Sequence, residues 1–198
     1  AKLPLHQWGP KKNPKAVILA LHGFNDYGQF IKDAAEFFAH QGYKVYAYDQ
    51  RGFGGAPHFG RWPGRHALSD DLITVTKLLR QKHPKKSLFH LGSSMGAAVI
   101  MKAATLNTPL KTEGIILVAP AVRGRADMCI YERWAIGLLS HTTPWAKLTG
   151  KQLNVKPSDN IEMLRALDRD PMIIKKTRID SIWGLINLMD DAVAAAPK

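Results

Sequence analysis

The most distinctive chemistry in the sequence is a serine with a glycine two positions away on each side. Residues 92–96 read Gly-Ser-Ser-Met-Gly, with Ser94 at the centre, between an apolar segment (87–91) and a run of small residues (97–104). A Gly-x-Ser-x-Gly turn between a strand and a helix exposes its serine as a nucleophile. We therefore expect Ser94 to be a catalytic nucleophile and the rival Ser93, which lacks this glycine spacing, to be inert. The alternative is a glycine-rich turn with a non-reactive serine.

A second loop could stabilise the negative charge that such a nucleophile creates. Residues 22–28 form a polar, glycine-bearing segment directly after the apolar run 16–21. An oxyanion hole takes one backbone N–H from the residue after the nucleophile and one from such a loop. We expect Met95 and Phe24 to be these donors, each worth about 3 kcal/mol in the transition state. Their side chains are then free to shape an acyl pocket. His22 could serve as a base, but a role in shaping the turn is the more common use of such a residue.

The elements that position these groups alternate along the first 120 residues. Apolar segments predict an edge strand at 3–8 and buried strands at 16–21, 43–48, 87–91 and 114–120, with helices at 31–40, 67–83 and 97–104. Ser69 or Asp70 could cap the helix at 67–83. This alternation is typical of a parallel sheet with helices on both faces. In such sheets functional groups gather at the carboxyl ends of the strands, where His22, Asp49 and Ser94 all lie.

The pattern changes after Ala121, where we expect only helices. Helical spacing is present at 128–140, at 159–167 (capped by Ser158 or Asp159) and twice within 172–196. We therefore divide the chain into a core of residues 1–121 and a helical cap of residues 122–198. An apolar cap would cover a pocket, although ordinary helical core would look the same in sequence.

Composition narrows the class of protein. With 198 residues, 45% of them hydrophobic, the chain can form one sizeable core. The net charge of +12 comes from scattered residues, which favours a solvated basic surface, with contact to an anionic membrane as the alternative. Nucleic-acid binding is not expected, because no basic run is interleaved with aromatic residues. No apolar stretch is long enough to span a bilayer, which favours a cytoplasmic or membrane-peripheral protein without fixing its localisation. We also expect a bacterial origin.

Neither a metal nor a cofactor is expected. No histidine and cysteine cluster has ligand spacing. The single cysteine, Cys129, lies between apolar residues, which predicts a buried thiol. The sequence gives no indication of oligomeric state.

Three motifs carry a family resemblance. Residues 21–28 (LHGFNDYG), 48–54 (YDQRGFG) and 91–96 (LGSSMG) resemble the monoacylglycerol lipase/lysophospholipase (serine aminopeptidase S33-like) branch of the α/β-hydrolase superfamily. The resemblance implies the α/β-hydrolase fold with a helical cap, Ser94 as nucleophile, and hydrolysis of small lipid esters such as monoacylglycerols or lysophospholipids. It also implies that Asp49 organises its loop and is not the triad acid. A serine at this position argues against epoxide hydrolases and dehalogenases.

The remaining triad members cannot be identified in the sequence. In this family an acid and then a histidine follow the cap, whereas no histidine follows His141. The acidic residues near the end, Asp180, Asp190 and Asp191, fall in predicted helices and receive no role. One interpretation is a fragment, truncated before the last strands and inactive by itself. The other is a naturally short enzyme that uses His22 or His141 as base. The alternative to an enzyme is a binding module whose cap forms a lipid or partner groove.

Overall fold

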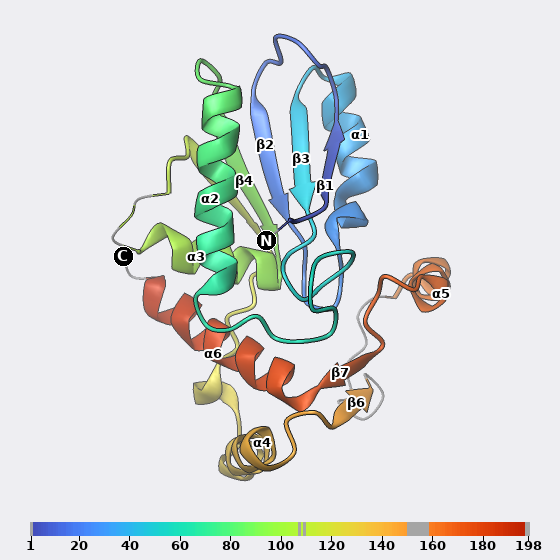
Figure 1. Ribbon diagram of the computed structural model, residues 1–198, viewed down its shortest axis with the longest axis vertical. Coiled ribbons are helices and arrows are strands. Elements are labelled where there is room, and N and C mark those ends of the chain that lie inside the picture. The colour runs from blue at the N-terminus through green and yellow to red at the C-terminus, as the bar shows by residue number, and fades with distance from the viewer. Residues whose placement is uncertain (1, 107, 109, 150–158, 197–198) are drawn as a thin grey trace.

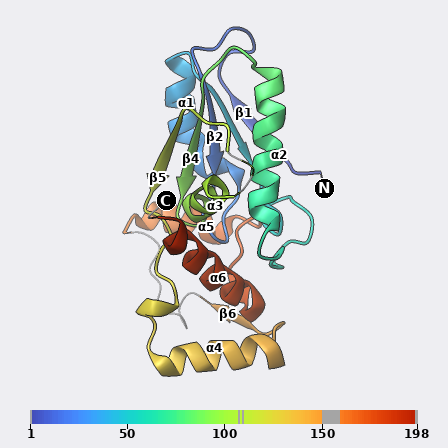
Figure 2. The same ribbon diagram turned by 90° about the vertical axis from the view of Figure 1, so that its left-hand side faces the viewer.

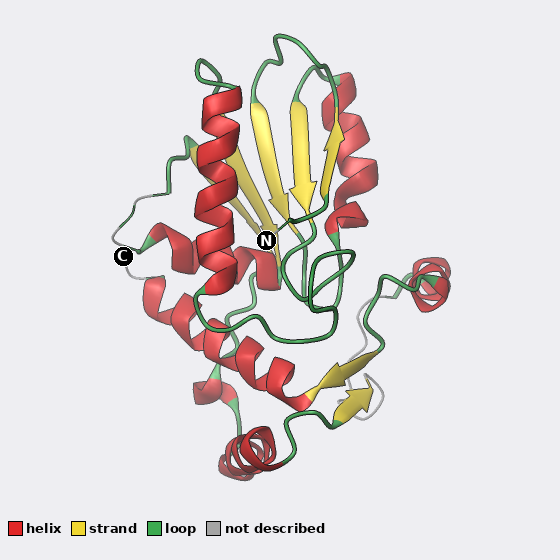
Figure 3. Cartoon of the chain, in the orientation of Figure 1, coloured by secondary structure: helices red, strands yellow, loops and turns green. Residues whose placement is uncertain are grey.

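The sheet and its helices occupy most of the chain (Figure 1). The computed structural model describes residues 2–106, 108, 110–149 and 159–196. Figure 3 distinguishes the helices and strands of this part by colour. In chain order the elements are β1 (Leu5–Trp8), β2 (Val17–Leu21), the 3-10 helix η1 (Gly28–Ile31), α1 (Lys32–His40), β3 (Lys44–Tyr48), α2 (Ala67–Lys82), β4 (Leu88–Ser93), α3 (Met95–Ala104), β5 (Gly114–Val118), η2 (Arg125–Asp127), α4 (Ile130–Thr142), β6 (Lys147–Thr149), α5 (Ile161–Arg169), β7 (Lys176–Arg178) and α6 (Ile179–Ala195).

Five strands form the main sheet in the order β1-β3-β2-β4-β5. β2, β3, β4 and β5 are parallel, and β1 pairs antiparallel with β3 at one edge. The predicted mostly parallel sheet with its edge strand is therefore confirmed. Leu21 pairs in register with Gly92, so β2 and β4 end at the same level of the sheet. This register brings the loop after β2 beside the turn after β4.

The sheet is covered on both faces. All five residues of β2 are 5% exposed or less, as the continuous apolar run predicts. Because successive side chains point to opposite faces, Val17, Leu19 and Leu21 join the cluster under α2 and α3, whereas Ile18 and Ala20 join the cluster under α1. Figure 2 shows α1 and α2 on opposite sides of the strands. The result is a layer of helices on each side of one sheet.

β5 is less buried than the sequence predicts. Its apolar residues Ile115, Ile116, Leu117 and Val118 keep between 39% and 47% of their surface exposed. β5 lies at the edge of the sheet, next to β4 alone. The prediction of a fourth buried strand is therefore correct in its position and wrong in its burial, because an apolar run reads alike in a central strand and an edge strand. An exposed apolar edge is a surface on which another strand can pair.

The region after Ala121 contains two short strands, so the prediction of helices alone is wrong. β6 and β7 pair antiparallel, with Leu148 opposite Thr177. Each has only three residues, mostly polar, so neither shows the alternation that identifies a strand. The two helices expected within 172–196 are a single helix, α6, which begins directly after β7.

α6 packs onto the sheet domain, whereas α4 lies beyond it. Leu188 and Ala192 of α6 belong to the same buried cluster as the strands. Lys102 of α3, only 5% exposed, pairs with Asp191 of α6 at 2.8 Å, and Arg65 pairs with the same carboxylate at 2.7 Å. In both views of the ribbon α6 lies between α3 and α4 (Figures 1 and 2).

Three smaller predictions need correction. His66 precedes α2, and Ser69 and Asp70 lie inside the helix and do not cap it. The side chain of Asn160 caps α5 by accepting a hydrogen bond from the Met163 N–H at 3.0 Å; of the expected caps, Ser158 lies outside the described residues and Asp159 lies one residue too early. Cys129 is exposed, since it lies just before the outer helix α4. Among the described residues, no helix combines the length and the apolar character needed to cross a bilayer.

Candidate active site

Ser94 occupies the sharp turn that the sequence predicts. It lies between the last residue of β4 and the first of α3, with φ of 50° and ψ of −112°. A positive φ in a residue other than glycine is strained and persists only where the surroundings hold it. The Ser94 N–H donates to the Val118 carbonyl at 3.0 Å, and the Ser94 carbonyl accepts from the Ala121 N–H at 3.1 Å. These two bonds tie the turn to the end of β5.

The two glycines around Ser94 are required by close backbone approach. A Cβ at Gly92 would lie 2.5 Å from the Ala97 nitrogen, and one at Gly96 would lie 2.3 Å from the Leu21 carbonyl oxygen. Both distances are too short for any side chain, so this turn accepts only glycine at either position. The Gly-x-Ser-x-Gly spacing is therefore a geometric requirement of the strand–turn–helix connection.

The loop after β2 reaches the same turn. A Cβ at Gly23 would lie 3.5 Å from the Cβ of Ser94, so Gly23, the residue before Phe24, lies beside the serine. Met95 is the first residue of α3, and its N–H therefore has no partner within the helix. Ser94 thus lies between Met95 and the loop that contains Phe24, and the role of these two residues as backbone donors stays a prediction.

His22 holds this loop in place with both ring nitrogens. Its Nδ1 donates to the Gly23 carbonyl at 2.8 Å, and its Nε2 accepts from the Gln50 N–H at 2.9 Å. Because C=O and N–H point in opposite directions in a trans peptide, the bond to Gly23 also orients the Phe24 N–H. Complete burial lowers the pKa of His22 to about 4, so the ring is neutral at pH 7. Neither ring nitrogen is left to accept a proton from Ser94.

Asp49 organises the neighbouring loop from its buried position after β3. Its Oδ1 accepts from the Gly28 N–H at 2.9 Å and lies 2.8 Å from the Nε2 of His6, and its Oδ2 accepts from the Gly55 N–H at 2.8 Å. The carboxylate therefore connects β1, the loop after β2 and the loop after β3. This geometry favours the loop-organising role of Asp49 over that of a triad acid.

The same loop is fastened to the segment that precedes α6. The Asn25 side chain donates to the Thr177 hydroxyl at 2.7 Å, and the Asn25 carbonyl accepts from the Ile174 N–H at 3.0 Å. The Tyr27 hydroxyl donates to Asp170 at 2.8 Å. Burial and this hydrogen bond raise the pKa of Tyr27 to about 12. Sequence reasoning does not find these contacts, because their partners are about 150 residues apart.

Aromatic rings line the side of the loop near Phe24. The ring centroid of Phe24 lies 5.7 Å from that of Phe53 and 6.4 Å from that of Trp62. The indole of Trp62 rests on the backbone of α6, where a Cβ at Gly184 would lie 2.3 Å from it. Phe24 therefore contributes to an apolar wall. The sequence does not indicate that Trp62 belongs to this wall, because the residue lies in an irregular segment without periodicity.

The acidic residues near the end of the chain, which receive no role from the sequence, are engaged in ion pairs. Asp180 pairs with Arg178, and Asp190 pairs with Arg125. Asp191 accepts from Arg65 and Lys102, and the hydrogen bond from Arg65 is the main cause that lowers its pKa to about 2.

The second candidate base is His141. It lies on α4, on the far side of α6 from α3, and its Nδ1 lies 2.7 Å from the Gly137 carbonyl oxygen. The structure therefore does not bring His141 to Ser94.

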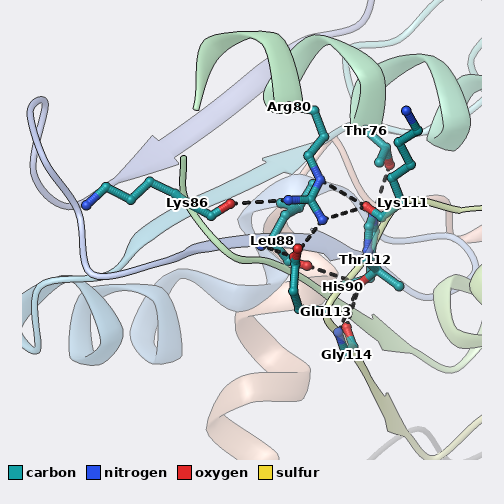
Figure 4. Close-up of polar contacts among 9 residues, drawn as sticks. All are labelled: Thr76, Arg80, Lys86, Leu88, His90, Lys111, Thr112, Glu113 and Gly114. Carbon is teal, nitrogen blue, oxygen red and sulfur yellow. Dashed lines mark hydrogen bonds and ion pairs between the residues drawn. The ribbon is translucent and has the colours of Figure 1, made fainter. Parts of the chain in front are cut away.

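A separate polar network closes the opposite end of the sheet (Figure 4). Arg80 of α2 donates to Glu113 at 2.5 Å, and the same carboxylate accepts from the Leu88 N–H at 2.6 Å. Further along β4, the Nε2 of His90 lies 2.8 Å from the Thr76 hydroxyl. Burial lowers the pKa of His90 to about 4. These residues lie at or near the amino-terminal ends of the strands, away from Ser94. They connect α2 to β4 and to the residue before β5.

Metal ligands do not cluster in the described residues, where no group of three histidine, cysteine, aspartate or glutamate side chains could hold an ion.

The sheet order, the crossover helices and the strained serine together define the class of protein: this is the α/β-hydrolase fold. Solved structures agree. The chain aligns over its whole length with 72% of the "Paleococcus ferrophilus monoacylglycerol lipase" at a TM-score of 0.72 and 18% identity. It also aligns over 95% of its length with 68% of a thermostable carboxyl esterase from Bacillus coagulans, at a TM-score of 0.75. At these identities the likeness concerns the fold.

Sequence comparison narrows the class to a family. Residues 12–198 match the family described as serine aminopeptidase, S33, and the chain belongs to it. It is 26% identical over 176 residues to the monoacylglycerol lipase of Mycolicibacterium smegmatis, and 28% identical over 121 residues to the monoglyceride lipase of Rattus norvegicus. These alignments cover 87% and 58% of the chain. The chain spans 58% of the first relative and 38% of the second. The predicted branch of the α/β-hydrolases is thus confirmed.

Proposed function

We propose that Ser94 is the nucleophile of a carboxylic ester hydrolase that works through an acyl-enzyme. One observation carries the proposal: a strained serine precedes α3, and Gly23 of the loop after β2 lies beside it. Strained backbone of this kind clusters at active sites. The named activities of the relatives, monoacylglycerol and monoglyceride lipases, support the same class of reaction.

The reaction proceeds in two steps. The Ser94 Oγ attacks the ester carbonyl while a base removes its proton, and the carbonyl oxygen becomes an oxyanion that accepts hydrogen bonds from the Phe24 and Met95 N–H groups. The positive end of the α3 dipole favours this charge. The alcohol then leaves with a proton, and the acyl group stays on Ser94. Water attacks the acyl-enzyme in the same way and releases the carboxylate.

The substrates we propose are esters of single-chain lipids, of the monoacylglycerol or lysophospholipid type. The aromatic wall of Phe24, Phe53 and Trp62 would contact an acyl chain. Residues 122–198 would form the cap over it, with α6 in contact with Trp62. We also propose peripheral contact with anionic lipid surfaces, on the basis of the net charge of +12.

We propose that the acid and the histidine of the triad come from polypeptide outside residues 1–198. Within the described residues, Ser94 Oγ has no hydrogen bond to a histidine, both ring nitrogens of His22 are engaged, and His141 lies beyond α6. Loss of a triad member lowers turnover by about 10⁴ to 10⁶ in well-studied hydrolases. We therefore expect this 198-residue chain to be nearly inactive alone.

The test is rescue by an external base. Imidazole added to the 198-residue chain should raise hydrolysis of p-nitrophenyl butyrate above the rate with Ser94→Ala, which reports the imidazole background. Ser93→Ala is the matched control and should behave like the unchanged chain. Fluorophosphonate treatment in imidazole should leave an adduct on Ser94, located by peptide mass spectrometry.

Two results would change the proposal. Hydrolysis at an ordinary enzymatic rate without imidazole, lost in Ser94→Ala, would show that the base lies within the 198 residues. Absence of a Ser94 adduct and of any rescue would instead favour the non-catalytic binding module.

A further inference from the structure

We propose that a groove between α4 and α6 binds one long-chain carboxylate at a site separate from Ser94. The groove has a volume of about 510 Å³. Ile130, Trp134 and Leu138 of α4 form its apolar side, and Trp183 of α6 lies opposite them. The site lies on the outer side of α6, away from α3 (Figure 2).

The groove depends on a glycine inside a helix. Gly137 lies in the interior of α4, where glycine is disfavoured relative to alanine. A Cβ at this position would lie 3.6 Å from Cη2 of Trp183, which is ordinary contact. The backbone geometry therefore does not require glycine here. The missing side chain instead leaves space beside Cη2 of Trp183, and a larger residue would fill it.

The charge of the groove selects an anion. Two arginines line it, and no acidic side chain does. Arg125 lies over the Trp183 ring, with Cζ 4.1 Å from the ring centroid, and its charge is already balanced by Asp190. Arg133 has no ion pair within the described part of the chain and is exposed. Arg133 is thus the cation available to a carboxylate.

The apolar side of the groove selects an alkyl chain. Ile130, Trp134 and Leu138 are 54%, 73% and 65% exposed, and a chain lying along them would remove this apolar surface from water. A second copy of this protein fits less well, because two molecules of charge +12 repel each other. An amphiphile with one anionic end and one chain matches both features.

The proposal of this binding site is independent of the proposed hydrolysis, because none of the residues that line the groove touches the loop beside Ser94. A long-chain carboxylate is nevertheless the acid product of that reaction. Ser94→Ala should therefore leave binding unchanged, and failure of one proposal leaves the other standing.

Calorimetric titration of the 198-residue chain with decanoate and dodecanoate, below their micelle concentrations, tests the proposal. We expect one saturable site, with dodecanoate binding about fifteenfold more tightly than decanoate, since each of its two additional buried methylenes contributes about fourfold. Dodecyltrimethylammonium should not bind, because its positive charge is opposite to that of a carboxylate and would be repelled by Arg133.

Two groove variants and two controls complete the test. Gly137→Leu should weaken dodecanoate binding at least tenfold by filling the groove, and Arg133→Gln should weaken it about fivefold by removing the cation. Phe37→Ser and Lys32→Gln, at exposed positions on α1, are the matched controls and should bind as the unchanged chain does. If Gly137→Leu proves unfolded by circular dichroism, Arg133→Gln alone decides.

Several outcomes would overturn the proposal. No binding of dodecanoate would refute it, as would binding that Arg133→Gln leaves unchanged. Binding to phosphatidylglycerol vesicles without binding of monomeric dodecanoate would instead identify a membrane surface. Dimerisation that Gly137→Leu abolishes would identify a second copy of the chain as the occupant.

Discussion

Two buried histidines should make the fold sensitive to mild acid. His22 and His90 are both fully buried. Burial lowers the pKa of each to about 4, from a value of 6.5. The neutral ring of His22 accepts the Gln50 N–H, and the ring of His90 lies against the Thr76 hydroxyl. Protonation would place a charge in the core at both sites.

The pH window and the size of the effect follow from these values. Above pH 6.5 both rings are neutral in the folded and the unfolded chain, so stability is fully present. Between pH 6.5 and about 4 only the unfolded chain takes up the protons, so the free energy of unfolding falls as the pH falls. The full loss is about 3 kcal/mol for each histidine. At pH 5 the two together should lower the free energy of unfolding by about 4 kcal/mol. Domains of this kind have about 5–15 kcal/mol in total.

Urea unfolding of the 198-residue chain at pH 7.5, 6 and 5 measures this loss. The double variant His90→Leu, Thr76→Val removes one histidine together with its partner, and should halve the decrease between pH 7.5 and 5. His40→Gln, at an exposed position, is the control and should leave the decrease unchanged. A pH dependence as steep in the double variant as in the unchanged chain would refute the reasoning.

Three further changes test the framework around the site. Gly96→Ala places a Cβ 2.3 Å from a backbone oxygen of β2, so it should lower the free energy of unfolding by at least about 3 kcal/mol in urea, whereas Gly137→Ala should not lower it. Asp49→Asn turns one acceptor of a buried carboxylate into a donor facing an N–H, and should lower the free energy of unfolding by about 2–4 kcal/mol. Asp168→Asn, at an exposed position, is the control and should change the free energy of unfolding by less than about 0.5 kcal/mol. Equal losses in the two variants would contradict the role of Asp49. Leu117→Lys places a charge on the exposed edge of β5 and should reduce light scattering of concentrated samples, and unchanged scattering would show that this edge does not drive association.

The features that the sequence predicts are those set by neighbours in the chain. The continuous apolar run predicts the strand β2, and Gly92 is required because a side chain there would strike an atom of Ala97, five residues further along the chain. Gly96 is recognised through its spacing from Ser94, although the atom that excludes a side chain there belongs to the distant Leu21. Local spacing therefore carries enough information to place the turn and the strands.

The features that the sequence does not predict depend on contacts between distant segments. The bonds from Asn25 to Thr177 and from Tyr27 to Asp170 join residues about 150 positions apart, and none of these side chains belongs to a periodic pattern. The exposure of β5 has the same origin, because burial of a strand is decided by what lies next to it. An apolar run carries no information about whether its neighbour is present.

β5 and the turn at Ser94 are joined by a hydrogen bond. Their arrangement indicates from which direction a catalytic base could approach Ser94. Val118 is opposite Ser93 in the sheet register and accepts the Ser94 N–H at 3.0 Å. β5 therefore ends beside the candidate nucleophile. A further parallel strand on the exposed edge of β5 would end at the same level, because parallel strands in register share their carboxyl edge. Residues following such a strand would lie on the β5 side of Ser94, opposite the loop that His22 and Asp49 hold in place.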